Sequence, residues 1–158
     1  MHHPASRPDF PIDEPPRARL LVVDDEQLLR ELYGRVLSLE GYEVETAADG
    51  VEGLEWLAAQ PFDLVIVDRH MPRLDGATLL LALRSAGSDL PVIMISGSLA
   101  FTPLPAGVTR ELSAALNKPA RRAEVISAVA AALSPAASRL MPKRESLDDF
   151  RRVHLAAA

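Results

Sequence analysis

The chain has 158 residues, a formal net charge of −5 at pH 7 and no cysteine. That length suffices for one domain with a hydrophobic core and short tails, and the acidic balance argues against a protein built mainly to bind nucleic acid. Without cysteine there are no disulfides, thiolate metal sites or thiol nucleophiles. No apolar stretch approaches the roughly 18 residues of a membrane-spanning helix, and the N-terminus lacks the apolar core of a signal peptide, so we expect a cytoplasmic protein that binds no membrane.

The sequence divides into a lead, a central region and a tail. Residues 1–18 are rich in proline and show little periodicity, so we expect a disordered lead. Residues 19–133 alternate strand-like and helix-like patterns and form the predicted domain. Residues 134–158 follow as a short appendage.

The first half of the central region predicts two strands and two helices. Residues 20–23 form a continuous apolar run, as expected for a strand that is buried on both faces. Residues 42–46 alternate apolar and charged side chains, which favours a half-buried strand at a sheet edge. Between them Gly41 fits a helix stop, and Asp49 is placed to cap a second helix. The apolar positions of these two helices are Leu29, Leu32, Val36 and Leu39 in the first, and Val51, Leu54 and Leu57 in the second.

The second half continues the alternation. Residues 64–67 and 92–95 are apolar runs that predict buried strands, and a leucine-rich helix at residues 76–84 lies between them after a loop with Pro72. Leu116 lies in a short, weak fifth strand. The last helix spans residues 121–133, and its apolar face carries Val125, Val129 and Leu133.

The whole pattern predicts an α/β fold of five βα units, in which a parallel sheet has helices on both faces. The fourth helix is the exception, because Pro103, Pro105 and Gly107 interrupt it. We therefore expect that helix to be short, shifted or irregular.

The tail carries one candidate helix. Pro135 and Pro142 break its first part, but Ser146 could cap a helix over residues 146–155 with an apolar stripe at Leu147, Phe150 and Leu155. We expect this helix to pack on the domain or on a partner. The tail is too short for a DNA-binding output domain with its own core, so no nucleic-acid partner is expected.

Polar side chains follow the predicted strands at the points where the strands end. Asp24 and Asp25 close the first strand, Asp68 closes the third, Ser96 follows the fourth, and Lys118 follows the fifth. In a parallel sheet these groups share one edge, so three carboxylates, a hydroxyl and an ammonium meet in one pocket. A divalent cation that holds a phosphoryl group over a nucleophilic Asp is the best explanation of so much charge.

This ordered set resembles the receiver domain of two-component response regulators. The matching motifs are Asp24-Asp25, Asp68 with Met71-Pro72 and Asp75-Gly76 beyond it, Ser96-Gly97, and Lys118-Pro119. The resemblance covers residues 19–133 and implies the flavodoxin-like strand order 2-1-3-4-5, which the edge character of residues 42–46 independently supports. It also implies a cis peptide bond between Lys118 and Pro119.

The resemblance assigns a role to each residue of the site. Asp68 becomes the phosphorylated nucleophile, and Mg²⁺ is held by Asp25 and Asp68 directly, by Asp24 mainly through water, and by the carbonyl of His70. Lys118 and the Ser96 hydroxyl bind phosphoryl oxygens, and the small Gly97 leaves its backbone N–H accessible. Positioning and charge neutralisation carry the transfer.

The implied partners are a histidine kinase or phosphotransfer protein and an unknown downstream target, and a homodimer is compatible with the family. The chain would be a signalling protein, not an enzyme acting on other molecules, since its chemistry is confined to its own phosphorylation and dephosphorylation. His70 and Ser98 lie beside the phosphoryl group by resemblance, where they either tune its lifetime or face solvent as loop residues.

The sequence departs from the family at the positions that transmit the signal. Many receivers carry an aromatic residue three positions before the lysine, where this chain has Ala115, and the usual small-residue turn before the fifth strand is replaced by Glu111-Leu112. The coupling of the hydroxyl to that aromatic cannot operate here. Phosphorylation should survive, whereas its readout must differ.

Two other functions remain as alternatives. A pseudo-receiver would bind partners without phosphorylation, but the intact acidic set argues against it. A haloacid-dehalogenase-like phosphatase also uses a strand-end Asp with Mg²⁺, but it needs a second Asp two residues later, where this chain has His70.

Overall fold

The computed structural model describes residues 15–97 and 103–140. Its elements are β1 (Arg19–Val23), α1 (Gln27–Leu39), β2 (Glu43–Ala47), α2 (Gly50–Ala59), β3 (Leu64–Asp68), α3 (Gly76–Ser85), β4 (Val92–Ser96), α4 (Ala106–Glu111), β5 (Ala114–Asn117), α5 (Arg122–Ala132) and α6 (Pro135–Leu140). The candidate tail helix at residues 146–155 and most of the lead lie outside the described residues.

The five strands form one parallel sheet in the order β2-β1-β3-β4-β5. This arrangement confirms the flavodoxin-like order 2-1-3-4-5. The alternating strand β2 lies at one edge, as its pattern predicted, and the short β5 lies at the other. The three central strands are buried on both faces, which explains their continuous apolar runs.

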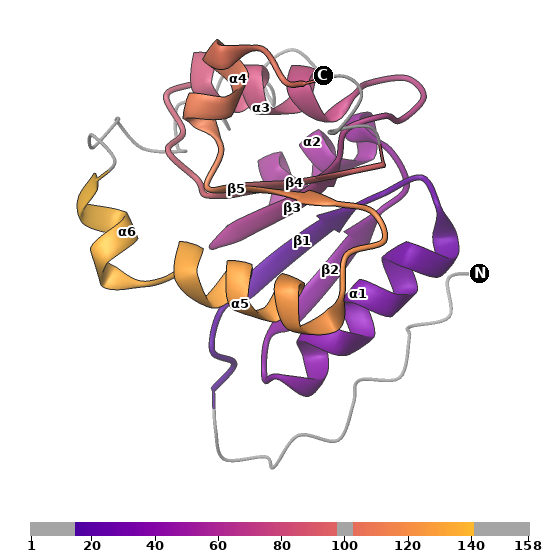
Figure 1. Cartoon of the computed structure of the whole chain (residues 1–158), viewed down its shortest axis with the longest axis vertical. Coiled ribbons are helices and arrows are strands. Elements are labelled where there is room, and N and C mark those ends of the chain that lie inside the picture. The colour runs from indigo at the N-terminus through magenta and orange to yellow at the C-terminus, as the bar shows by residue number, and fades with distance from the viewer. Residues whose placement is uncertain (1–14, 98–102, 141–158) are drawn as a thin grey trace.

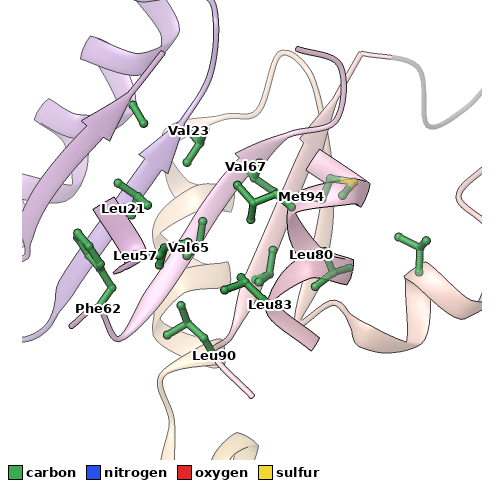
Figure 2. Close-up of a cluster of buried hydrophobic side chains, with 14 residues drawn as sticks. Leu21, Val23, Leu57, Phe62, Val65, Val67, Leu80, Leu83, Leu90 and Met94 are labelled. Atoms are coloured by element: carbon green, nitrogen blue, oxygen red, sulfur yellow. The ribbon is translucent and has the colours of Figure 1, made fainter. Parts of the chain in front are cut away.

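Helices cover both faces of the sheet, with α1 and α5 on one side and α2, α3 and α4 on the other (Figure 1). Successive strand residues point to opposite faces, so each strand contributes to two cores. Leu20, Val22 and Ile66 belong to the core under α1 and α5. Figure 2 shows the other core, whose labelled side chains come from the strands, from α2 and α3, and from the loops before β3 and β4: Leu21, Val23, Leu57, Phe62, Val65, Val67, Leu80, Leu83, Leu90 and Met94.

The buried face of α1 differs from the predicted one. Leu32 and Leu39 are 51% and 62% exposed, so they do not face the sheet. The helix has more apolar residues than one face can hold, and the stripe that packs against β2, β1 and α5 has a regular i, i+4, i+7, i+8 spacing. Its members are Leu29, Tyr33, Val36 and Leu37.

The helix α4 has only six residues, which confirms the expectation of a short helix. It begins directly after Pro105, but Gly107 lies within it and does not interrupt it, contrary to the prediction. Its end is tied to α3 by Arg84, whose side chain is only 7% exposed and whose Nε donates to Glu111 Oε2 at 3.0 Å. The same guanidinium donates to the carbonyls of Ser88, Leu90 and Glu111. Glu111, which replaces a small turn residue, therefore holds the short helix in place.

The helix α6 corrects one prediction about the tail. Pro135 was expected to break the structure, but it begins α6 instead. Proline fits the first position of a helix, because its missing N–H would have no partner within the helix there and its fixed φ suits the helical turn. A proline in the sequence therefore marked a helix start, not an interruption.

No helix within the described part of the chain is long and apolar enough to cross a membrane.

Candidate functional site

Three carboxylates meet at the carboxyl ends of the neighbouring strands β1 and β3. Asp24 and Asp25 directly follow β1, and Asp68 is the last residue of β3. One carboxylate oxygen from each of the three lies within 4.8 Å of the other two. Asp24 and Asp68 are 2% and 6% exposed, whereas Asp25 faces solvent. The structure therefore brings together the acidic cluster that the sequence predicted.

Lys118 enters this cluster from the end of β5. Its Nζ lies 3.0 Å from Asp24 Oδ2 and 3.1 Å from Asp68 Oδ2. The side chain is only 13% exposed, so water screens these pairs weakly. The backbone N–H of Lys118 donates to the carbonyl of Ser96 at 2.9 Å, which fixes the start of the loop beyond β5. The Lys118–Pro119 peptide bond is cis, as the resemblance implied.

Glu26 is a fourth carboxylate that the sequence interpretation missed. Its Oε1 lies 3.2 Å from Lys118 Nζ, and its side chain is 62% exposed. The only sequence feature that pointed to Glu26 was its position directly after Asp25. A charged residue just before a helix is ordinarily interpreted as a favourable partner of the helix start, not as part of a site. The ammonium of Lys118 thus contacts three carboxylates, two of them buried.

The backbone around Asp24 is held firmly in place. Asp24 N–H donates to the carbonyl of Ala47, and Asp24 Oδ1 accepts the N–H of Glu26 at 2.9 Å. The carbonyl of Asp24 accepts a hydrogen bond from Arg30 of α1 at 2.6 Å. These contacts leave Asp24 little freedom to move when its partners change.

The loop after Asp68 passes very close to the strand end. A Cβ on Gly76 would lie 2.4 Å from the carbonyl oxygen of Asp68, so only glycine fits there. Asp75 caps α3 by accepting the N–H of Thr78 at 2.7 Å. The Asp75-Gly76 pair therefore serves to close the loop tightly over the strand that carries Asp68.

The other predicted site residues lie around the cluster. Ser96 is fully buried at the end of β4, one position beyond the Ile95 that pairs with Asp68. Gly97 is exposed, and among the described residues a Cβ there would meet Lys118 Cβ at 4.0 Å, which is ordinary contact. His70 is exposed, and its N–H lies 3.5 Å from Asp68 Oδ1. Ser98 lies outside the described residues.

The acidic cluster fits a Mg²⁺ ion. Mg²⁺ prefers oxygen ligands and commonly binds through one or two carboxylates while it keeps several waters. Asp24, Asp25 and Asp68 would hold it, and the exposure of Asp25 leaves room for water on that side. With no sulfur ligand in the cluster, soft metals have no advantage there.

Burial and charge shift the acidities of the two central groups. Burial raises the pKa of Asp68 to about 6 against the pull of Lys118, and the charge of Asp24 adds to the rise. Burial works against the charge of Lys118, but the hydrogen bond and charge of Asp24, together with those of Asp68, raise the pKa of Lys118. One ammonium therefore does not fully compensate the buried carboxylates, and a cation would relieve the remaining repulsion.

The raised pKa predicts how the metal-free chain responds to pH. The Asp68 carboxyl should titrate near pH 6 in the folded chain, above its ordinary 3.8 in the unfolded chain, so folding favours its protonated form. In that range the folded state binds more protons than the unfolded state, so Asp68 lowers the stability as the pH rises from about 4 to about 6. Saturating Mg²⁺ should move the titration midpoint of Asp68 to lower pH, because a cation favours the ionised carboxylate.

Nuclear magnetic resonance of the side-chain carboxyl carbon of Asp68 would measure this midpoint. Asp63, at the opposite end of β3, is the reference carboxyl in the same spectra. A metal-free Asp68 midpoint close to the ordinary 3.8, or no response to Mg²⁺, would contradict the account.

Comparisons with known proteins agree with this geometry. The sequence profile of the family described as response regulator receiver domain matches residues 20–130. The response regulator MprA of Mycobacterium ulcerans is 40% identical over 115 residues, which are 73% of this chain and 50% of that protein. The chain spans about half the length of the curated relatives it matches.

Solved structures give the same result. A response regulator receiver domain protein from Clostridium thermocellum has a TM-score of 0.68 and 28% identity, and the match covers 78% of this chain and 99% of that one. The receiver domain of the Francisella response regulator 1452 has a TM-score of 0.67 and 27% identity, with 73% and 96% of the two chains covered.

Proposed function

The chain belongs to the response regulator receiver domain family, and on that premise we propose that it accepts a phosphoryl group from a histidine kinase or phosphotransfer protein onto Asp68. The observation that carries this proposal is the contact set of Asp68. Its carboxylate is buried beside two further strand-end carboxylates and lies 3.1 Å from the Lys118 ammonium. Receiver domains are signalling proteins, and this chain would use its chemistry only on itself.

The residues divide the work of the transfer between them. An ionised Asp68 oxygen attacks phosphorus while the bond from phosphorus to the donor nitrogen breaks and its electron pair leaves with the imidazole. Mg²⁺ held by Asp24, Asp25 and Asp68, with the carbonyl of His70 as a further ligand, would offset negative charge on the carboxylates and the phosphoryl oxygens. Lys118 donates to one phosphoryl oxygen, and the protein positions these groups before the reaction starts.

Two residues would complete the phosphoryl site. The Ser96 hydroxyl, buried at the end of β4, would bind a second oxygen, and the Gly97 N–H would donate beside it. Their placement next to Lys118, whose N–H donates to the Ser96 carbonyl, supports this assignment.

Two alternative functions have less support. The dehalogenase-like phosphatase needs an Asp two residues after the nucleophile, and the exposed His70 occupies that position. A pseudo-receiver would have no need for a buried Asp68, a buried Asp24 and a lysine that contacts both. We also propose a cytoplasmic location, because the phosphodonors would be cytoplasmic and would have to reach the chain.

Phosphoryl labelling separates these functions. The purified chain would be incubated with Mg²⁺ and acetyl phosphate, and separately with candidate kinases from its own genome, and its mass would be followed over time. The proposal expects a single phosphoryl adduct that is sensitive to hydroxylamine, as acyl phosphates are. A pseudo-receiver would stay unlabelled, and a phosphatase would instead turn over small phosphate esters continuously.

A further inference from the structure

The ammonium of Lys118 already has carboxylate partners in this structure. An ammonium has three N–H donors, and Lys118 Nζ lies near three carboxylate oxygens at 3.0, 3.1 and 3.2 Å. The partners are Asp24, Asp68 and Glu26. All three donors are therefore engaged before any phosphoryl group arrives.

The three partners are not equivalent. Asp24 and Asp68 have side chains that are 3% and 7% exposed, and they belong to the rigid strand ends. Glu26 is 62% exposed, so its carboxylate approaches Lys118 from the solvent side of the site. Two buried partners already position the ammonium, and the third is not needed for that purpose.

We propose that Glu26 is a brake on phosphoryl uptake: it occupies the solvent-facing donor of Lys118 and must be displaced by the incoming phosphoryl oxygen. This inference rests on the proposed function of Asp68 and adds a residue to its control. Glu26 stands apart from the three-carboxylate cluster that fits the metal, so it acts through Lys118 and does not itself touch the reacting atoms.

Displacement has a direct structural consequence. Glu26 is the residue immediately before α1, and its backbone N–H donates to Asp24 at 2.9 Å. The phosphoryl group would release the Glu26 side chain while its backbone stays anchored. The freed carboxylate would then lie at the start of α1, where the partial positive charge of the helix favours it.

The test compares Glu26→Gln with the wild-type chain at saturating Mg²⁺. The amide has nearly the same shape but no charge, so its attraction to Lys118 is weaker and labelling by phosphoramidate should be faster by about fivefold, the effect of one unit charge a few ångströms away in a mostly aqueous setting. The matched control is Glu31→Gln, because Glu31 is exposed on α1, which begins directly after Glu26, and bonds only Gln27 in the described contacts. Its rate should stay at the wild-type value.

A double-mutant cycle tests whether the effect passes through Lys118. In a Lys118→Ala background, whose slower labelling is followed at higher donor concentration, Glu26→Gln should give no gain. An equal gain in both backgrounds would mean that Glu26 merely repels the anionic donor, and would overturn the inference. High salt should also reduce the gain, since about 1 M salt screens charges beyond about 3 Å.

The outcomes separate this inference from the function on which it rests. A labelled wild-type chain with an equally fast or slower Glu26→Gln variant would overturn the role of Glu26 and leave Asp68 as the acceptor. A wild-type chain that takes no label from any donor would overturn both. Mg²⁺ affinity, measured by calorimetry, should be nearly the same in Glu26→Gln and in the wild type.

Discussion

Asp68→Asn should lower phosphoryl uptake by a factor on the order of 10³ or more, to the level of background labelling. The Asn side chain has nearly the same shape, so the fold and the loop over the strand end are preserved. Its amide, however, is a very weak nucleophile and cannot form the acyl phosphate. The rate of labelling by acetyl phosphate with Mg²⁺, followed by mass spectrometry, measures the effect.

The matched control for this variant is Asp63→Asn. Asp63 precedes the same strand at its opposite end and accepts the backbone N–H of Arg19 at 2.8 Å, a bond that the Asn oxygen can keep. The control should be labelled at the wild-type rate. Undiminished labelling of Asp68→Asn would show that another residue is the acceptor.

Removal of divalent cations should have an equally large effect. Without a cation, the phosphoryl group would meet buried carboxylates that one ammonium does not fully compensate, so labelling in excess chelator should fall to background. Added Mg²⁺ should restore it. Labelling that resists chelation would contradict the metal assignment.

The two adjacent aspartates should contribute unequally to Mg²⁺ binding. Loss of a direct ligand is expected to weaken binding by more than about 100-fold, whereas loss of a residue that acts through water typically costs roughly 10-fold to 100-fold. Asp25→Ala should therefore weaken binding more than Asp24→Ala. The structure supports this order, because Asp24 Oδ2 is engaged by Lys118 and Asp24 Oδ1 by the Glu26 N–H, while Asp25 is exposed. Calorimetry of both variants decides, and the reverse order would refute the assignment.

The strand ends were the most predictable part of the molecule. Continuous apolar runs of four or five residues identify buried strands, and parallel strands must end at the same edge, so Asp24, Asp25, Asp68 and Lys118 had to meet. The same reasoning placed β2 at an edge, because its charged residues cannot face two helical layers.

Side-chain choices within the helices were less predictable. The first helix has apolar residues on several faces, and only its packing against β2, β1 and α5 decides that Tyr33 and Leu37 are buried while Leu32 is exposed. A proline such as Pro135 can either interrupt a helix or begin one, and the neighbouring sequence does not distinguish the two. Contacts between residues far apart in the sequence, such as Arg84 with Glu111 and Lys118 with Glu26, produce no periodic pattern in the sequence that could predict them.

The region through which a phosphoryl group on Asp68 would be sensed is the most unusual part of this chain. Ala115 is exposed on the edge strand β5, where many family members carry an aromatic residue. The neighbouring α4 is short and is held at its end by buried Arg84. The prediction that residues 146–155 carry the output stands on the sequence alone, and hydrogen exchange with and without beryllofluoride would test it.

Identification of the phosphorylated residue tests the central claim most directly. The wild-type chain would be labelled with acetyl phosphate and Mg²⁺, the acyl phosphate trapped by borohydride reduction, and the peptides sequenced by tandem mass spectrometry. The account predicts one modified residue, Asp68, in the peptide that spans the end of β3. Modification at Asp24, Asp25 or any other residue, with Asp68 intact, would contradict it.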